Sequence, residues 1–361
     1  MDTYKKIRKK LESLSEAEQF LQEYYHACQN PITQMQFLKN GGNQTFLSYF
    51  PLRLKNQKGI EGGLETITDT SVYEMNECLV YKEEKLNHDI LINKHPCYLP
   101  KFFHKHDFFE LLFVLKGEFC HEIDGQRETI QEGNLVFIAP ENVHALSVFD
   151  ESVVMTIYIR RSTFELAFFN LLRKENVLSL FFLESLYSRK KISHLIMDTD
   201  KDQEIKQSII EMYAEASTND YYSDQILLSM FNLLIFKLAR NYGQNIRIPS
   251  SGKESDSKID EILQYIYENY QTVSLNSTAE HFHYSPAYCS RLIRSHTDTT
   301  FSSIVKNAKL GTAQSILKNT KMTVEELALH IGYESKQAFI KAFQKETGMT
   351  PAAYRNARNC H

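Results

Sequence analysis

The sequence predicts a multidomain α+β protein. An antiparallel β-barrel of the jelly-roll type, with flanking helices, precedes an all-α domain of two helix-turn-helix units. Three observations lead to this fold. Apolar residues alternate with period two between about residues 89 and 161. A polar stretch rich in Ser and Gly covers 244–258, and two similar pairs of short helical patterns follow residue 259.

The composition excludes several classes of protein. The chain has 361 residues, of which 42% are apolar, which suits two or three globular domains with a sizeable core. Its six cysteines are scattered without a CxxC pair, which argues against a disulfide framework or structural zinc module and is typical of a reduced cytoplasm. No apolar run approaches the ~20 residues that span a bilayer, and no apolar segment follows the basic N-terminus. We therefore expect neither a membrane anchor nor a secretory signal.

Residues 1–88 are predicted to form a mostly helical extension. An amphipathic stripe indicates a helix from about residue 4 to residue 29. The stripe consists of Leu11, Leu14, Leu21, Tyr25 and Cys28. It either packs on the next domain or pairs with a second subunit, and core packing is the favoured interpretation.

The range 89–161 is predicted to be a small antiparallel barrel or jelly roll. Several short apolar runs with period two, such as 110–115, 134–138 and 153–159, are separated by turn signals. Asp124-Gly125 is typical of a tight hairpin turn between two of these strands.

This barrel contains a possible metal or ligand site. His104, His106 and Glu110 have the spacing HxHxxxE, and His144 ends the run PENVH. Residues two apart on a strand point to the same side, and imidazoles with a carboxylate suit zinc, iron or manganese. The pattern resembles the two cupin motifs, in which these four side chains converge on one metal, although Asn142 replaces the usual glycine. We favour a role for the four residues in lining an effector pocket, and expect no cofactor.

The range 162–243 is predicted to be helical again and to form a linker or dimerisation region. Its last segment is so apolar that it must be buried, either in a dimer interface or in the core of its own domain. The candidate interface residues are Leu227, Leu228, Phe231, Leu234 and Ile235. Residues 244–258 then read as a flexible linker.

Residues 259–361 are predicted to hold two helix-turn-helix units as an internal repeat. Ala279, Phe282 and Tyr284 of the first unit stand 49 residues before Ala328, Ile331 and Tyr333 of the second. In the second unit, Gly332 permits a left-handed turn and Ser335 is a natural N-cap for the following helix.

The second helix of each unit is expected to enter the major groove of DNA. Arg291 is the best candidate for reading a base, because Arg can bind guanine through two hydrogen bonds, and Arg294 is expected to contact phosphate. A solvated surface role is the alternative for each. The outward-facing residues are Ala287, Ser290, Arg291 and Arg294 in the first unit, and Lys336, Gln337, Ile340 and Lys341 in the second.

The second unit resembles the signature of AraC-type transcription regulators. The matching positions are Leu327-Ala328, Ile331-Gly332-Tyr333, Ser335, Phe339, Phe343, Gly348, Thr350-Pro351 and Tyr354-Arg355. The first unit departs from this signature at two positions, where His283 replaces the turn glycine and Asp298 replaces a helix-ending glycine. We expect the fold to survive, with a slightly different turn at His283.

Charge distribution supports DNA as a partner. The whole chain has a formal charge of −4, yet residues 285–361 contain eleven Lys and Arg against five Asp and Glu, a balance of +6. The resemblance implies a cytoplasmic homodimeric activator that works with RNA polymerase, controlled by a small-molecule effector, with a carbohydrate as one option. The alternatives are a metal-dependent cupin enzyme and an effector-independent DNA-binding protein whose barrel only dimerises; we expect no enzymatic activity.

Overall fold

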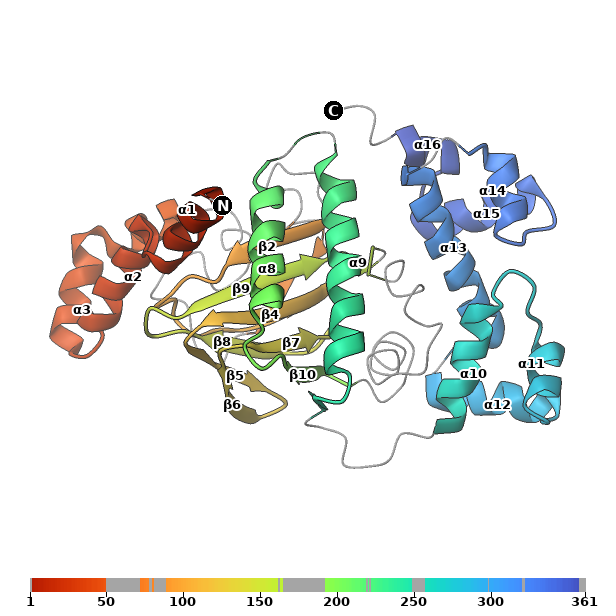
Figure 1. The fold of residues 1–361 in the computed structure, drawn as a ribbon, viewed down its shortest axis with the longest axis horizontal. Coiled ribbons are helices and arrows are strands. Elements are labelled where there is room, and N and C mark those ends of the chain that lie inside the picture. Colours follow the sequence, from red (N-terminus) through yellow and green to blue (C-terminus); the bar gives the residue numbers. More distant parts are fainter. Residues whose placement is uncertain are drawn as a thin grey trace. The chain divides into compact units, whose positions relative to one another are not determined.

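The computed structural model describes residues 2–49, 72–77, 80, 89–161, 163–164, 192–218, 220, 222–248, 257–297, 299–319 and 322–356. The chain divides into two compact units. Unit 1 contains residues 1–161 and 193–250, and unit 2 contains 162–192 and 251–361 (Figure 1). Among the described residues, no helix is long and apolar enough to cross a membrane.

Unit 1 is built on two β-sheets. The first sheet has the order β1 (Val72–Met75), β3 (Phe103–His106), β8 (His144–Ser147), β5 (Glu118–Ile123) and β6 (Gln126–Gln131). The second has the order β11 (Ile246–Arg247), β10 (His194–Asp198), β7 (Asn134–Ile138), β4 (Phe109–Lys116), β9 (Val153–Ile159) and β2 (Ile90–Lys94). The strands β2 to β9 fall inside the predicted range. The predicted jelly-roll domain is thus confirmed, as two β-sheets that do not close into one barrel.

Three strands outside that range correct the sequence-based description. β1 comes from the predicted helical extension and pairs parallel with β3, so the first sheet is not purely antiparallel. β10 lies inside the predicted helical region and pairs with β7. Its three apolar residues and His194 are buried, on both faces of the strand. β11 pairs with β10 at the start of the predicted linker, and Arg247 forms an ion pair with Glu128 of β6. Residues 249–256 of that linker lie outside the described residues.

Apolar side chains from both sheets form one core, which the N-terminal helices extend. The predicted single helix is divided into α1 (Asp2–Glu12) and α2 (Glu16–Ala27), because Ser15 and Glu18 form a capping box that starts a new helix. α3 (Pro31–Phe37) and α4 (Asn43–Tyr49) follow, joined by the short π-helical segment Leu38–Gly42. Of the predicted stripe, Leu21 lies in this core and Leu14 and Tyr25 pack against it, so core packing is confirmed for these residues, whereas Cys28 is exposed. Tyr24 and Phe46 join the same core.

Helices α8 (Gln203–Ala216) and α9 (Ser223–Tyr242) pack together and contact β2 of the second sheet (Figure 1). Four of the five candidate dimer residues, Leu227, Phe231, Leu234 and Ile235, are at most 4% exposed in the single chain. They therefore form core contacts rather than a dimer surface, and Leu228 is half-buried. The apolar segment 165–187, which was also predicted to be helical, lies outside the described residues.

Unit 2 is all α in its described residues, as predicted. Its helices are α10 (Ser257–Glu268), α11 (Leu275–His281), α12 (Pro286–Thr297), α13 (Phe301–Asn319), α14 (Val324–His330), α15 (Lys336–Thr347) and α16 (Pro351–Asn356). The pairs α11–α12 and α14–α15 are the two helix-turn-helix units, and α13 joins them (Figure 1). Ser335 caps α15 through the Ala338 amide at 3.2 Å, and Gly348 ends that helix with φ 72°, both as predicted.

Candidate functional site

The second helix of each unit presents the predicted residues on its open side. In α12 the side chains of Cys289 and Ile293 are fully buried, and in α15 those of Phe339 and Phe343 are. The opposite faces carry the eight predicted residues. Ala287, Arg291, Arg294, Lys336, Gln337 and Lys341 are exposed, and Ser290 and Ile340 are half-buried.

The two turns have the same backbone geometry, despite the different residues at their centres. His283 adopts φ 56° and Gly332 adopts φ 80°, so both are left-handed. The amide of Tyr284 donates to the Ala279 carbonyl at 2.7 Å, and the equivalent amide of Tyr333 donates to Ala328 at 2.8 Å. The expectation of a different turn at His283 is therefore wrong in this respect, because histidine tolerates the left-handed region better than most residues. Asp298 lies outside the described residues.

The basic residues on these faces differ in whether they form ion pairs. Lys336 lies 3.9 Å from Glu325 of α14, so part of its charge is balanced within the unit. Among the described residues, no ion pair involves Arg291, Arg294 or Lys341. Sequence reasoning missed Tyr288, which is 44% exposed beside Arg291 and whose ring contacts Tyr284 at 4.9 Å between centroids. Its position in the first turn of the predicted recognition helix could have indicated it as a candidate for DNA contact.

The histidine–glutamate cluster lies inside unit 1, between the two sheets. β3 supplies His104 and His106, β8 supplies His144, and β4 of the other sheet supplies Glu110. None of the four side chains is more than 4% exposed. The Nε2 atoms of His106 and His144 each lie 3.0 Å from the same Oε2 atom of Glu110. The structure therefore brings together all four residues that the sequence indicated.

The hydrogen bonds fix which atoms face each other in this cluster. The Nδ1–H of His106 donates to the Phe108 carbonyl at 2.7 Å, and that of His144 donates to the Asn142 carbonyl at 3.2 Å. A neutral ring that donates from Nδ1 has a lone pair on Nε2. Both lone pairs would then face an ionised carboxylate oxygen, which also only accepts. Positive charge is therefore required between these atoms, either as additional protons or as a metal ion.

Burial sets the electrostatics of the remaining groups. Burial tends to raise the pKa of Glu110, but its hydrogen bonds to His106 and His144 outweigh this effect and hold the pKa well below its usual value. Burial lowers the pKa of His104 well below its usual value, and its Nδ1 atom has no hydrogen-bond partner among the described residues. The interior thus combines an ionised carboxylate with a neutral imidazole whose Nδ1 atom lacks a hydrogen-bond partner among the described residues, which burial disfavours.

Two further histidines extend the cluster and were missed in the sequence. His121 of β5 lies 5.7 Å from His144 between ring centroids, and His194 of β10 lies 5.5 Å from His121. His121 is 1% exposed, and its Nε2 atom has no partner among the described residues. Alternation along β5 places His121 with the buried Phe119 and Ile123, which was a usable signal. The residues around His194 were predicted to be helical, so the sequence did not indicate that His194 lies beside His121.

The donor set fits a metal ion. One ligand atom from each of His104, Glu110 and His144 lies within 4.8 Å of the other two. Carbonyl acceptors at Nδ1 orient His106 and His144, which is how second-shell groups orient metal ligands. Asn142 does not disrupt the site, because its side-chain amide donates to the carbonyls of Ala139 and Pro140 and stabilises the turn before His144.

Comparison with known proteins matches both parts of the chain. Residues 98–229 match the family described as AraC-like ligand binding domain, and residues 278–357 match the family described as helix-turn-helix domain. The uncharacterized HTH-type transcriptional regulator YfiF of Bacillus subtilis is 26% identical over 260 residues, covering 70% of this chain and 78% of that protein.

Two more similar proteins cover most of the chain. The HTH-type transcriptional activator RhaR of Salmonella dublin is 20% identical over 257 residues, covering 71% of this chain and 87% of its own length. The solved structure of unsaturated fatty acid bound wild-type ToxT from Vibrio cholerae is 16% identical, with a TM-score of 0.30, and covers 75% of this chain and 96% of that one.

Proposed function

Because the chain belongs to the AraC family of helix-turn-helix transcription regulators, we propose that α12 and α15 bind one DNA duplex together and that a small molecule at the histidine–glutamate cluster controls this binding. The chain is thus a DNA-binding regulator with a ligand-binding domain. The proposal adds which residues read the DNA and where the effector binds.

One observation carries the DNA-binding part. Two equivalent turns place two second helices in the same local geometry, each with a buried apolar side and an exposed polar side. Residues on such a face contact base edges when the helix enters the major groove. Arg291 and Lys341 are the base-reading residues in this proposal, and Arg294 contacts phosphate.

The test is selection of bound duplexes from a random library with the full chain. We expect a site with two conserved segments about one helical turn apart, ~34 Å. Binding should weaken steeply with salt, since basic residues release counterions from the phosphates. A full chain that is folded but selects no sequence at moderate ionic strength would contradict the proposal.

The effector is proposed to bind beside the unpaired His104 and His121 atoms. Both atoms are buried and lack partners among the described residues, so a ligand with polar groups would supply the missing hydrogen bonds. Screening small molecules, with sugars first, for a rise in the melting temperature of the full chain tests this. A ligand that stabilises the wild type should lose this effect in His121→Phe. A ligand whose effect His121→Phe leaves unchanged binds elsewhere.

We propose that a metal ion in the effector site supplies the positive charge that the cluster requires, with additional protons as the other source. His104, Glu110 and His144 would hold it, and the ion would offer an open position to oxygen atoms of the effector. Elemental analysis of the purified protein should find stoichiometric zinc, iron or manganese. His144→Ala should lose the metal, whereas the exposed control His281→Ala should retain it. A metal-free wild type would leave protons as the source of the charge.

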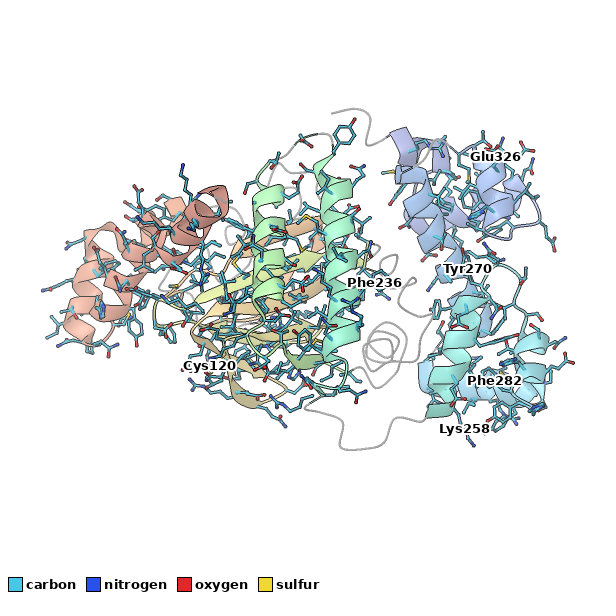
Figure 2. The ribbon with its side chains drawn as sticks, in the orientation of Figure 1. Cys120, Phe236, Lys258, Tyr270, Phe282 and Glu326 are labelled. Atoms are coloured by element: carbon cyan, nitrogen blue, oxygen red, sulfur yellow. The ribbon has the colours of Figure 1, made fainter. Side chains whose placement is uncertain are left out.

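We also propose that the chain is a cytoplasmic activator that works as a homodimer with RNA polymerase and has no enzymatic activity. The names of the regulators YfiF and RhaR support regulation, and that of RhaR supports activation. Exposed apolar residues of α9 offer a dimer surface, and Figure 2 labels one of them, Phe236. These are Ile226, Leu233 and Phe236, which are 40%, 55% and 42% exposed. Leu233→Glu should shift a dimer to monomer in sedimentation.

A further inference from the structure

The turn of the second helix-turn-helix unit contacts the first unit directly, apart from the helix α13 that joins them. The side-chain amide of Gln271, which follows α10, donates a 2.9 Å hydrogen bond to the carbonyl of His330 at the end of α14. Figure 2 labels Lys258 and Tyr270 at the two ends of α10, and Gln271 is the next residue. The contact thus connects the α10–α11 turn with the α14–α15 turn.

The same contact explains the glycine at position 332. A Cβ atom on Gly332 would lie 2.0 Å from the carbonyl oxygen of Gln271 and 2.8 Å from its carbon. Any side chain at this position would have to push the two backbones apart. The equivalent residue of the first turn, His283, is exposed, and its left-handed backbone is tolerated. Close approach of Gln271, in addition to the positive φ, is what requires glycine in the second turn.

Helix α13 holds the second turn from another side. The Nζ of Lys309 donates a 2.5 Å hydrogen bond to the carbonyl of Gly332 and lies 5.4 Å from the centroid of the Tyr333 ring. Burial lowers the pKa of Lys309, in keeping with its position under this turn. The turn is therefore contacted both by the first unit, through Gln271, and by the connecting helix.

α13 is a single helix that has buried residues on both units. Leu310 and Leu317 in its second half pack in the core of the second unit, while Ile304 and Ala308 in its first half are buried where α13 contacts α10 and α12. Gly311 follows Leu310 directly, inside the part of α13 that packs on the second unit. Glycine in a helix interior is less favourable than alanine by about 1 kcal/mol, so it lowers the intrinsic stability of this helix. A second contact away from the helix axis adds a restraint on the angle between the two units.

We propose that Gln271, Lys309 and Gly332 form a brace that fixes the separation and angle of the two recognition helices, α12 and α15. The three are positioning residues, which act on DNA through these helices. The inference rests on the proposed function, in which both helices bind one duplex at once. Each base pair inserted between the two contacted segments shifts one of them by about 3.4 Å and rotates it by about 34°. A braced protein must therefore discriminate strictly between spacings.

The first experiment compares two glycine variants of the full chain. Gly332→Ala introduces the clash with Gln271, while Gly348→Ala is the matched control, because Gly348 has φ 72° but no atom within 4 Å of an added Cβ. The DNA is the duplex selected by the wild type, and versions with one base pair inserted or removed between its two segments. We expect wild type and Gly348→Ala to lose about tenfold or more on altered spacing. Gly332→Ala should bind the original duplex more weakly and vary less than about threefold with spacing.

The second experiment measures the brace without DNA. Spin labels are attached through unnatural amino acids at Ser295 and Lys345, which are both exposed, in the full chain. The distance distribution should be narrow in the wild type and in Gly348→Ala, and broad in Gly332→Ala. If Gly332→Ala does not fold, the double variant Gln271→Ala with Lys309→Met removes both side-chain contacts without a clash and should broaden the distribution in the same way.

The outcomes separate the brace from the proposed function. A broad distribution in the wild type, or an unchanged spacing penalty in folded Gly332→Ala, would overturn the brace. A narrow wild-type distribution that Gly332→Ala broadens, together with no spacing dependence in the wild type, would support the brace and contradict simultaneous binding by two helices.

Discussion

His283 and Gly332 hold the same left-handed backbone conformation at equivalent positions of two turns, with φ of 56° and 80°. The glycine has no steric cost there, whereas a residue with a Cβ pays about 1 kcal/mol. The first turn therefore carries strain that the second does not.

His283→Gly is expected to stabilise the first helix-turn-helix unit by up to about 1 kcal/mol, less the entropy that glycine adds to the unfolded chain. Hydrogen exchange of the amides of Tyr284 and Cys289, which bond across and after this turn, should become slower. Faster exchange would mean that the His283 side chain contributes contacts that outweigh the strain.

Arg291→Ala and Lys341→Ala are expected to weaken binding to the selected duplex by about 1–3 kcal/mol and to leave binding to random DNA almost unchanged. Both side chains are exposed on recognition helices, where they reach base edges. Lys116→Ala in unit 1, also exposed, is the control and should change neither affinity. Equal losses on both DNAs would identify the two residues as phosphate contacts.

Glu110→Gln is expected to destabilise unit 1 by about 3 kcal/mol, because it removes the buried negative charge that lies beside the Nε2 atoms of His106 and His144. The amide keeps the shape of the carboxylate but carries no charge, so it no longer balances the positive charge that the two Nε2 atoms and the carboxylate oxygen require between them. Thermal denaturation of the full chain with and without a chelator measures the effect. If the variant and the wild type have the same melting temperature with and without the chelator, the cluster contains neither a stabilising charge pair nor a metal.

The N-terminal helix α2 is attached to the sheets by a nearly buried ion pair. Lys94 of β2 lies 2.7 Å from Glu18, whose side chain is 5% exposed. Burial raises the pKa of Glu18, but the hydrogen bonds from Lys94 and from the amides of Ser15 and Cys97 outweigh it, so the net pKa is lowered. Lys94→Met should cost about 3 kcal/mol, because the remaining carboxylate stays buried and unpaired.

A surface pair provides the comparison for this variant. Lys105 and Glu74 lie 2.8 Å apart but are 30% and 73% exposed, so Lys105→Met should cost less than about 1 kcal/mol. Urea denaturation of both variants measures the difference. Equal costs would show that burial of the Glu18 carboxylate does not matter.

Unit 1 is expected to lose stability as the pH falls from about 6.5 to about 4. Burial lowers the pKa of His194 to about 4, so the ring is neutral in the folded state over this range, while the unfolded ring takes up a proton near 6.5. The unfolded state then binds more protons, which removes about 3 kcal/mol by pH 4. His194→Phe should reduce the slope of stability against pH by about one proton. His26→Gln on the surface of α2 should not change it.

The sequence was most informative where one residue type fulfils one local requirement. Gly348 and Ser335 ended and began α15 as predicted, because a left-handed C-cap and an oxygen-bearing N-cap are local needs. The spacing of His104, His106 and Glu110 indicated a common site, because residues on one strand and the following strand converge across the two sheets.

Contacts between segments far apart in the sequence could not be predicted from local patterns. β10 lies in a range predicted to be helical, because its apolar run shows no alternation when both faces are buried. His194 therefore did not stand out as a site residue. β1 was missed because it gains its stability from pairing with β3 rather than from its own composition. Gln271 has no sequence signature, since its role depends on the turn of the other unit, 59 positions away.

The packing of α2 and α4 on the sheets affects how this sensor can be produced in isolation. A truncated fragment starting at Asp89 would leave out Leu21, Tyr24 and Phe46, which are at most 7% exposed in the full chain. The apolar side chains that they cover would then face water, and such a fragment would be prone to aggregate. A fragment for crystallisation or calorimetry of the sensor should therefore keep the helices α1 to α4.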